Sequence, residues 1–247
     1  MKRIFVPTMT GADWQRLLGK PDLHWKKGRS AMSAAACWEQ CHPRLPSEVT
    51  SVLDSSDDPA LSQLELLAAF PEWGVELPGG ATVSQTDILA IARNRRGLVV
   101  LGVEAKVDEP FGPTLGEKKH AASAGQLSRI AFLEKELGRT AVFDDRIRYQ
   151  LLHRTVSALL TARAFHASVA VMLIHSFSPI SRWREDFESF CQALDCRSNS
   201  ADLREVPGIQ GPRLLLGWCA GQEKFLEADL PSAFARIPPT GAPSVSS

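Results

Sequence analysis

The stretch QTDILAIARNRRGLVVLGVEAK, residues 85–106, decides the fold of this chain. Two apolar runs, 83–92 and 98–107, flank its polar segment RNRRG. Apolar runs of this length predict β-strands, and a short polar turn that ends in glycine predicts that the strands pair as an antiparallel hairpin. Because side chains alternate between the two faces of a strand, the second strand has one fully apolar face and one face that ends in Glu104 and Lys106.

Charged side chains interrupt both strands of this predicted hairpin. Asp87 precedes the apolar residues ILAI of the first strand, and pairing about the turn brings it beside Glu104 and Lys106. Desolvating two carboxylates and a lysine on a half-buried sheet face is unfavourable unless something compensates the charge. A divalent cation does so, since Mg²⁺ binds one or two carboxylates together with carbonyl groups and water. The pattern therefore indicates a metal site, with a surface ion pair at a strand end as the alternative.

The rest of the chain predicts a layered α/β (α+β) domain with a mixed sheet flanked by helices. Periodicity predicts helices at 30–40, 60–69, 126–137, 144–165 and 183–194, and further strands at 167–177 and 213–220. Ser30 is the expected N-cap of the first helix, and Gly138 the expected C-cap of the third. Residues 1–46, rich in Trp and Lys, are interpreted as a helical N-terminal extension, 47–230 as the α/β domain, and 231–247 as a disordered tail.

Composition and charge limit the class of protein. The chain has 247 residues, 28 basic and 28 acidic side chains, and 44 % apolar residues, which is typical of a globular protein that buries about 70 % of its unfolded surface. These values exclude a disordered chain and a polycation that holds nucleic acid by bulk charge. Five cysteines, an odd number, favour a reducing compartment, and we expect neither a secretory leader nor a membrane span. A cytoplasmic location is therefore the expectation.

The motif of the hairpin resembles that of a known superfamily. Asp87, sixteen intervening residues and then Glu104-Ala105-Lys106 are similar to the core of the PD-(D/E)XK nuclease-like proteins, and the resemblance covers residues 60–178. More narrowly, the chain resembles an uncharacterised bacterial family of that superfamily. The stretches that suggest this are HWKKGRSA (24–31), QTDILA (85–90), EAKVDEPFG (104–112), RYQLLHRT (148–155) and HSF (175–177).

This resemblance implies a restriction-endonuclease-like core of order αβββαβ and the hydrolysis of phosphodiester bonds in DNA or RNA, with Mg²⁺ or Mn²⁺ as cofactor. The implied metal ligands are Asp87, Glu104 and the carbonyl group of Ala105. The implied catalytic residues are Asp87, Glu104, Lys106, Glu65 as an auxiliary carboxylate on the preceding helix, and Gln150. Thr86 stands where the superfamily pattern has proline, and a Gln-xxx-Tyr element found in some members is absent.

Substrate contacts are expected from the helix at 144–165. Arg148, His153 and Arg154 could contact phosphates, although a solvated helix face explains the same pattern. Nucleic acid is the expected partner. The oligomeric state stays open, with a homodimer as one possibility because a duplex has two strands.

A catalytically inactive binding module on the same scaffold is the alternative function. The acidic stretch 48–76 favours it slightly, because acidic surfaces repel nucleic acid. Two further patterns in the sequence give weaker indications of function. Glu117-Lys118-Lys119 repeats the Glu-x-Lys spacing but lies in no apolar strand, and Cys37, Cys41 and His42 fit no zinc-binding pattern.

Overall fold

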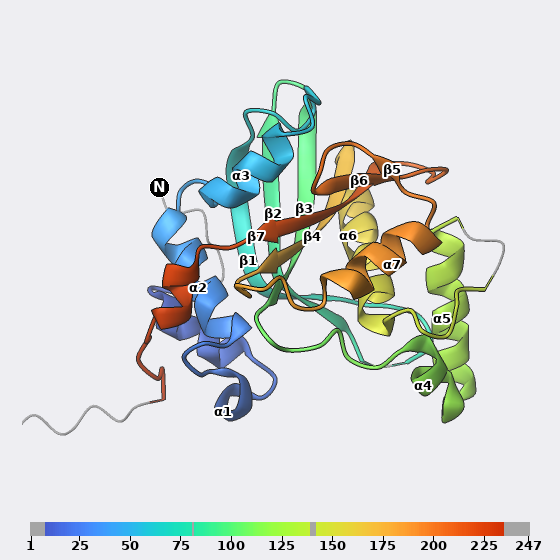
Figure 1. The fold of residues 1–247 in the computed structure, drawn as a ribbon, viewed down its shortest axis with the longest axis horizontal. Helices are drawn as coiled ribbons and strands as arrows, with labels where there is room; N and C mark the ends of the chain where they lie inside the picture. The colour runs from blue at the N-terminus through green and yellow to red at the C-terminus, as the bar shows by residue number, and fades with distance from the viewer. Residues whose placement is uncertain (1–7, 81, 139–141, 235–247) are drawn as a thin grey trace, which may run out of the picture.

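The computed structural model describes residues 8–80, 82–138 and 142–234. One mixed sheet of seven strands forms its centre, in the order β1-β2-β3-β4-β7-β6-β5 (Figure 1). The strands are β1 Glu65–Val75, β2 Ser84–Asn94, β3 Gly97–Lys106, β4 Val169–Ser176, β5 Arg197–Ser198, β6 Leu203–Val206 and β7 Arg213–Ala220. Strands β3, β4 and β7 are parallel, and the pairs at both edges are antiparallel.

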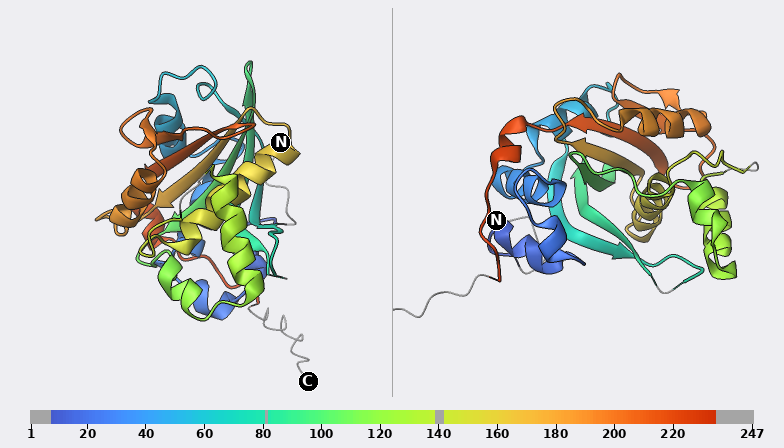
Figure 2. Two further views of the ribbon diagram at one scale, coloured as in Figure 1. Left: turned by 90° about the vertical axis from the view of Figure 1, so that its right-hand side faces the viewer. Right: turned by 60° about the horizontal axis from the view of Figure 1, so that its bottom comes forward.

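Helices cover both faces of this sheet. The helices are α1 Pro21–His24, α2 Ser30–Cys41, α3 Ser47–Asp54, α4 Leu115–His120, α5 Ala124–Glu136, α6 Tyr149–Ala164 and α7 Arg184–Ala193, with 3-10 helices η1 Gly11–Leu17 and η2 Glu223–Glu227. Helices α2 and α3 lie on one side, and α5, α6 and α7 lie on the other, as Figure 2 shows. The predicted fold class, a mixed sheet flanked by helices, is confirmed. No helix in the described ranges is long and apolar enough to cross a membrane.

The predicted hairpin is confirmed, and its two faces belong to two separate cores. Ile88 lies opposite Val103, and the ladder runs to the turn at Asn94 and Gly97. Val103 packs in the cluster that contains α2, whereas Val100 packs in the cluster that contains α6. Gly102 allows the close approach of α6, because a β-carbon at this position would lie 3.0 Å from that of Ala158.

The helix predicted at 60–69 is wrong, because this region enters strand β1. The strand pairs with β2 over nearly its whole length, and such pairing overrides the weak helical spacing of its leucines. Pro71 is compatible with this position because β1 is an edge strand, where a missing N–H does not break a ladder. The helix before the strand is α3, which follows Pro46.

Smaller differences occur at helix ends. The N-cap of α2 is Arg29 rather than Ser30, whose N–H and hydroxyl groups both donate to Glu109 Oε1 at 3.2 Å. Helix α6 begins at Tyr149 rather than at residue 144, because Arg148 forms a β-bridge with Thr114. Gly138 follows α5 with φ of 67°, as its predicted role at the helix end requires.

The described part of the predicted N-terminal extension is helical and packs on the sheet. Trp14 and Trp38 share a hydrophobic cluster with Leu101 of β3, so residues before 47 complete one face of the domain. Of the predicted tail, residues 231–234 are described and lie against η1, where Ser232 Oγ donates to Gln15 Oε1 at 3.0 Å. Residues 235–247 lie outside the described ranges.

Candidate active site

A pocket of about 610 Å³ opens where β1, β2 and β3 meet the first half of α6. The N-terminal segment around Lys20 and His24 forms its opposite wall. Its acidic lining residues are Glu72, Asp87, Glu104 and Glu109, and its basic ones include Lys20, Lys106 and Arg154. The pocket therefore gathers most of the residues that the sequence predicts for catalysis.

Three carboxylates form a row across three neighbouring strands. Glu72 lies between the residue pairs Pro71–Ile88 and Trp73–Thr86, which places it opposite Asp87. The β2–β3 ladder ends at the pair Ile88–Val103, and Asp87 and Glu104 are the next residues of the two strands, where Asp87 Oδ2 accepts a hydrogen bond from the N–H group of Ala105. All three side chains line the same pocket, and the charges of Asp87 and Glu104 act on Glu72. The row of Glu72, Asp87 and Glu104, here called the carboxylate row, therefore lines one wall of the pocket.

Glu104 is the most buried member of the carboxylate row, with 3 % of its surface exposed. Its Oε1 accepts hydrogen bonds from Lys106 Nζ and Gln150 Nε2, both at 2.7 Å, and its Oε2 accepts one from Arg154 Nε at 2.5 Å. Burial alone would raise the pKa of Glu104, but Arg154 and Lys106 lower it to about 2. Glu104 is thus ionised at neutral pH.

Asp87 is half-buried and has one oxygen available. Its Oδ2 accepts a hydrogen bond from the N–H group of Ala105 at 2.8 Å, and no described residue hydrogen-bonds its Oδ1. Burial and the nearby charge of Glu104 raise the pKa of Asp87 to about 7, against the opposing effect of Arg154. This raised pKa is typical of a carboxylate in excess of its counter-ions.

Glu72 completes the carboxylate row and was not predicted. Burial, together with the charges of Asp87 and Glu104, raises its pKa to about 9. Within the described ranges no donor forms a hydrogen bond with its carboxylate. The expected helix at 60–69 hid this residue, since only the register of β1 against β2 brings Glu72 to Asp87.

Glu65, the predicted auxiliary carboxylate, is not brought to the site. It begins β1, is exposed, and forms a 3.7 Å ion pair with Arg93 at the turn end of the hairpin. Seven residues of extended strand separate it from Glu72, a distance of about 23 Å. The prediction failed because it assumed a helix, in which Glu65 would have pointed toward the motif.

Lys106 and Gln150 lie where the sequence predicts. Lys106 is buried, its Nζ binds Glu104, and the same ammonium group lies 5.2 Å from the ring centre of Phe111. Gln150 reaches Glu104 from the first turn of α6. Ala105 also lines the pocket between Glu104 and Lys106.

The predicted substrate-binding residues divide into two groups. Arg154 and His153 line the pocket. Arg148 does not, because its Nε donates to Asp186 of α7 at 3.0 Å and its guanidinium also donates to the carbonyl group of Gly112. Burial and Arg154 lower the pKa of His153 to about 3, so this ring is neutral at physiological pH.

Comparison with known protein families places the chain. A family model described as a domain of unknown function, DUF6946, matches residues 7–223. The chain belongs to the DUF6946 family. No curated protein and no solved structure matches it. The DUF6946 match includes the carboxylate row, the N-terminal segment that walls the pocket and all seven strands.

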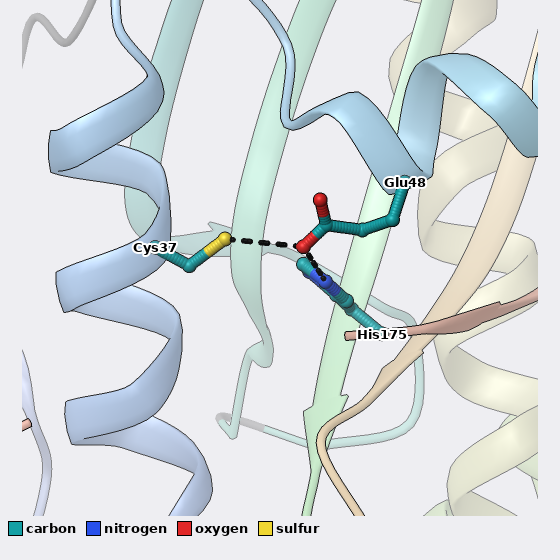
Figure 3. A group of neighbouring side chains, drawn as sticks. All are labelled: Cys37, Glu48 and His175. Atoms are coloured by element: carbon teal, nitrogen blue, oxygen red, sulfur yellow. Dashed lines mark hydrogen bonds and ion pairs between the residues drawn. The ribbon is translucent and has the colours of Figure 1, made fainter. Parts of the chain in front are cut away.

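This DUF6946 chain has a second charged cluster on the opposite face of the sheet, formed by Cys37, Glu48 and His175 (Figure 3). Glu48 Oε1 lies 3.5 Å from Cys37 Sγ and 3.4 Å from His175 Nε2. The three ligand atoms lie within 4.8 Å of one another, and this set of donors could hold a Zn²⁺ ion. In the sequence Cys37, Cys41 and His42 fit no zinc-binding pattern, and nothing there linked Cys37 to Glu48 or His175.

Hydrogen bonds reach Glu48 and His175 from residues around this second cluster. Trp38 Nε1 donates to His175 Nδ1 at 3.4 Å, so the ring proton of a neutral His175 is on Nε2, which faces Glu48. Gln222 Nε2 and Ser47 Oγ donate to Glu48 Oε2 at 2.9 and 3.0 Å. Burial would raise the pKa of Glu48, but His175 and these donors hold it well below its usual range. A single carboxylate is thus surrounded by donors.

Proposed function

We propose that this DUF6946 chain hydrolyses phosphodiester bonds in DNA or RNA with Mg²⁺ or Mn²⁺ as cofactor. The observation that carries the proposal is the carboxylate row, three acidic side chains from three neighbouring strands in one open pocket. With α4 and α5 as additional helices between β3 and α6, the elements α3, β1, β2, β3, α6 and β4 follow the αβββαβ order that the resemblance to PD-(D/E)XK nucleases implies, which supports it. The five unpaired cysteines agree with a cytoplasmic location for this activity.

The donor set of the carboxylate row fits a hard divalent cation. Glu72 and Asp87 Oδ1 lack hydrogen-bond donors in the described ranges, and burial together with the neighbouring carboxylates raises the pKa of both groups. Oxygen ligands of this kind are preferred by Mg²⁺ and Mn²⁺. When bound, such an ion lowers the pKa of a coordinated water and stabilises charge on a phosphate.

Each remaining residue of the pocket has a role in this proposal. Lys106 is held by Glu104 at 2.7 Å, where its ammonium group can hold the attacking water or a phosphate oxygen. Gln150 fixes the orientation of the same carboxylate. Arg154 and His153 face the pocket from α6 and can contact the substrate.

The direct test is a calorimetric titration of Mg²⁺ and Mn²⁺ into the wild type and single variants. We expect Asp87→Ala and Glu104→Ala to lose binding and Glu72→Ala to weaken it about tenfold, which is a loss of about 1.4 kcal/mol. Glu65→Ala is the matched control, because it removes a glutamate that lies on the same strand as Glu72 but outside the pocket. This variant should bind the metal ions as the wild type does. A second titration with an oligonucleotide present tests for a metal site that binds its ion only together with a substrate phosphate. Full metal binding by Asp87→Ala would contradict the proposal.

One observation favours the alternative, a binding module without catalysis. Arg154 and Lys106 already neutralise Glu104, so a metal ion has to compete with two cations for this ligand. In that case the protein would bind an oligonucleotide in EDTA but would release no cleaved product with Mn²⁺. The proposed nuclease would produce cleaved product that disappears in Lys106→Ala.

A further inference from the structure

A second pocket, of about 530 Å³, adjoins the carboxylate row and has the opposite charge. It shares Gln85, Tyr149, His153 and Arg154 with the first pocket. No acidic residue lines it, whereas four line its neighbour. The two pockets therefore form one continuous surface whose acidic side chains all lie in the first pocket.

Two cations of this second pocket have no carboxylate partner among the described residues. Lys118 Nζ lies 5.3 Å from the ring centre of Tyr149 and takes part in no ion pair within the described ranges. Arg129 donates to three backbone carbonyl groups, those of Leu77, Pro78 and Gly80, at 2.9 to 3.0 Å. Carbonyl groups hold a guanidinium in place without cancelling its net charge. The positive charge of Lys118 and Arg129 is thus available to a ligand.

His153 adds a neutral donor through a short relay. Arg154 donates to Ser84 Oγ at 3.1 Å, so the hydroxyl proton of Ser84 is free to donate to His153 Nδ1 at 2.8 Å. The proton of the neutral ring is then on Nε2, for which the described chain offers no hydrogen-bond acceptor. Nε2 is therefore an unused N–H donor on the wall that the two pockets share.

The electrostatic environment of His153 agrees with this charge distribution. Its pKa is lowered to about 3, first by burial and then by Arg154, and both Arg129 and Lys118 act in the same direction. A cationic His153 would add to the charge of three neighbours. Because His153 stays neutral above about pH 4, the positive charge of the pocket comes from Lys118, Arg129 and Arg154.

We propose that this second pocket binds a phosphate group of the substrate that is adjacent to the phosphate cleaved at the carboxylate row. Its substrate class rests on the proposed function, but the binding itself does not require a metal. Lys118 supplies charge, His153 Nε2 supplies a directed hydrogen bond, and Arg154 bridges the two pockets through Glu104 and Ser84. Phosphate oxygens accept both kinds of contact. The preferred substrate thus has at least two consecutive phosphates.

The test uses a fluorescein-labelled single-stranded oligo-dT of about twelve nucleotides, with EDTA present so that hydrolysis cannot occur, and reads fluorescence anisotropy. We expect Lys118→Ala to weaken binding about fivefold at low ionic strength and to reduce the slope of log K against log salt by about 0.7, the value for one phosphate contact on a single strand. Lys119→Ala is the matched control, since its ammonium group pairs with Asp145 at 2.9 Å. It should change binding by less than about twofold.

A second arm replaces the oligonucleotide with inorganic phosphate and reads thermal stabilisation. Phosphate should raise the melting temperature of the wild type and of Lys119→Ala, but not that of Lys118→Ala. Stabilisation by phosphate without oligonucleotide binding would support the second pocket as a phosphate site, but for a small phosphorylated ligand. It would contradict the proposed nuclease activity. Oligonucleotide binding that depends on Lys118, with no cleavage in Mn²⁺, would likewise retain the pocket and contradict only the proposed function. Equal effects of Lys118→Ala and Lys119→Ala, or no binding of either probe, would overturn the inference.

Discussion

The two faces of the sheet are each covered by an ionised glutamate, buried Glu104 on one and half-buried Glu48 of α3 on the other, and the two differ in what surrounds them. Glu104, toward α6, and Glu48, toward α2, are both held ionised by nearby donors. The residues that reach each face alternate along the same strands, since Glu104 is followed by Ala105, whose partner in β4 is His175. Consecutive residues of the same strand thus face an open pocket on one side of the sheet and a closed cluster on the other.

The difference lies in the balance of charge and in access to solvent. Around Glu48 there is one carboxylate and several donors, with Cys37 and His175 fully buried. Around Glu104 there are two further carboxylates whose pKa values are raised, and the group lines a pocket. Unmatched charge that a ligand can reach indicates a functional site, whereas matched charge in a closed space indicates a structural role.

The largest effect is expected on hydrolysis. Lys106→Ala should lower the rate of oligonucleotide cleavage by at least about a hundredfold, the usual contribution of a positioned group in proton transfer. The reason is that Lys106 Nζ is the ammonium group that Glu104 holds in the pocket. The measurement is cleavage of a labelled oligonucleotide in Mn²⁺. Cys37→Ala, from the closed cluster, should retain the wild-type rate, and equal losses in both variants would remove the distinction between the two faces.

The next largest effect is on stability, and here a variant of the cluster around Glu48 should be affected while metal binding at the carboxylate row is not. Glu48→Ala should lower the free energy of unfolding by about 3 kcal/mol, because it leaves the buried groups of Cys37 and His175 without their carboxylate. Chemical denaturation monitored by tryptophan fluorescence measures this change. Metal binding at the carboxylate row should be unaffected. A stable Glu48→Ala protein that binds no Mn²⁺ would show that Glu48 belongs to the functional site instead.

The sequence predicts the hairpin and three of its site residues because strand alternation is a local rule. Asp87, Glu104 and Lys106 follow from it directly. Glu72 could not be found, since its place depends on the register of β1, and β1 has helical spacing in its first half. The role of Arg148 depends on α7, whose acidic first turn is distant in the sequence. Contacts between distant segments therefore account for what was missed.

The two faces should also differ in their dependence on pH. The pKa of Asp87 is raised from 3.8 to about 7, so its contribution to stability is present below pH 4 and is lost as the pH rises to 7. Glu72, raised from 4.5 to about 9, extends this loss to higher pH. The pKa of Glu104 is lowered, so its contribution to stability changes only below pH 4.5 and is lost as the pH falls to about 2.

In Asp87→Asn the free energy of unfolding should therefore decrease less steeply between pH 4 and 7 than in the wild type. The slope should differ by up to about 1.4 kcal/mol per pH unit, the value for one proton. Denaturation curves at several pH values measure this slope. Addition of Mn²⁺ should have a similar effect on the wild type, because a bound cation displaces the protons. Glu48→Gln should leave the slope between pH 5 and 7 unchanged, since Glu48 is already ionised there. An unchanged slope in Asp87→Asn would contradict the assigned charge excess.

The smallest effect concerns Trp38. Trp38→Phe removes the indole N–H that donates to His175 Nδ1 and should lower the free energy of unfolding by about 1 kcal/mol. The same change frees Nδ1 to take the ring proton and leaves Nε2 able to bind a metal ion. In the wild type, where Nε2 carries the proton and lies 3.4 Å from Glu48 Oε1, we expect no zinc in the purified protein by elemental analysis. One equivalent of zinc that disappears in His175→Ala would assign the closed cluster to a metal, and both faces of the sheet would then be functional.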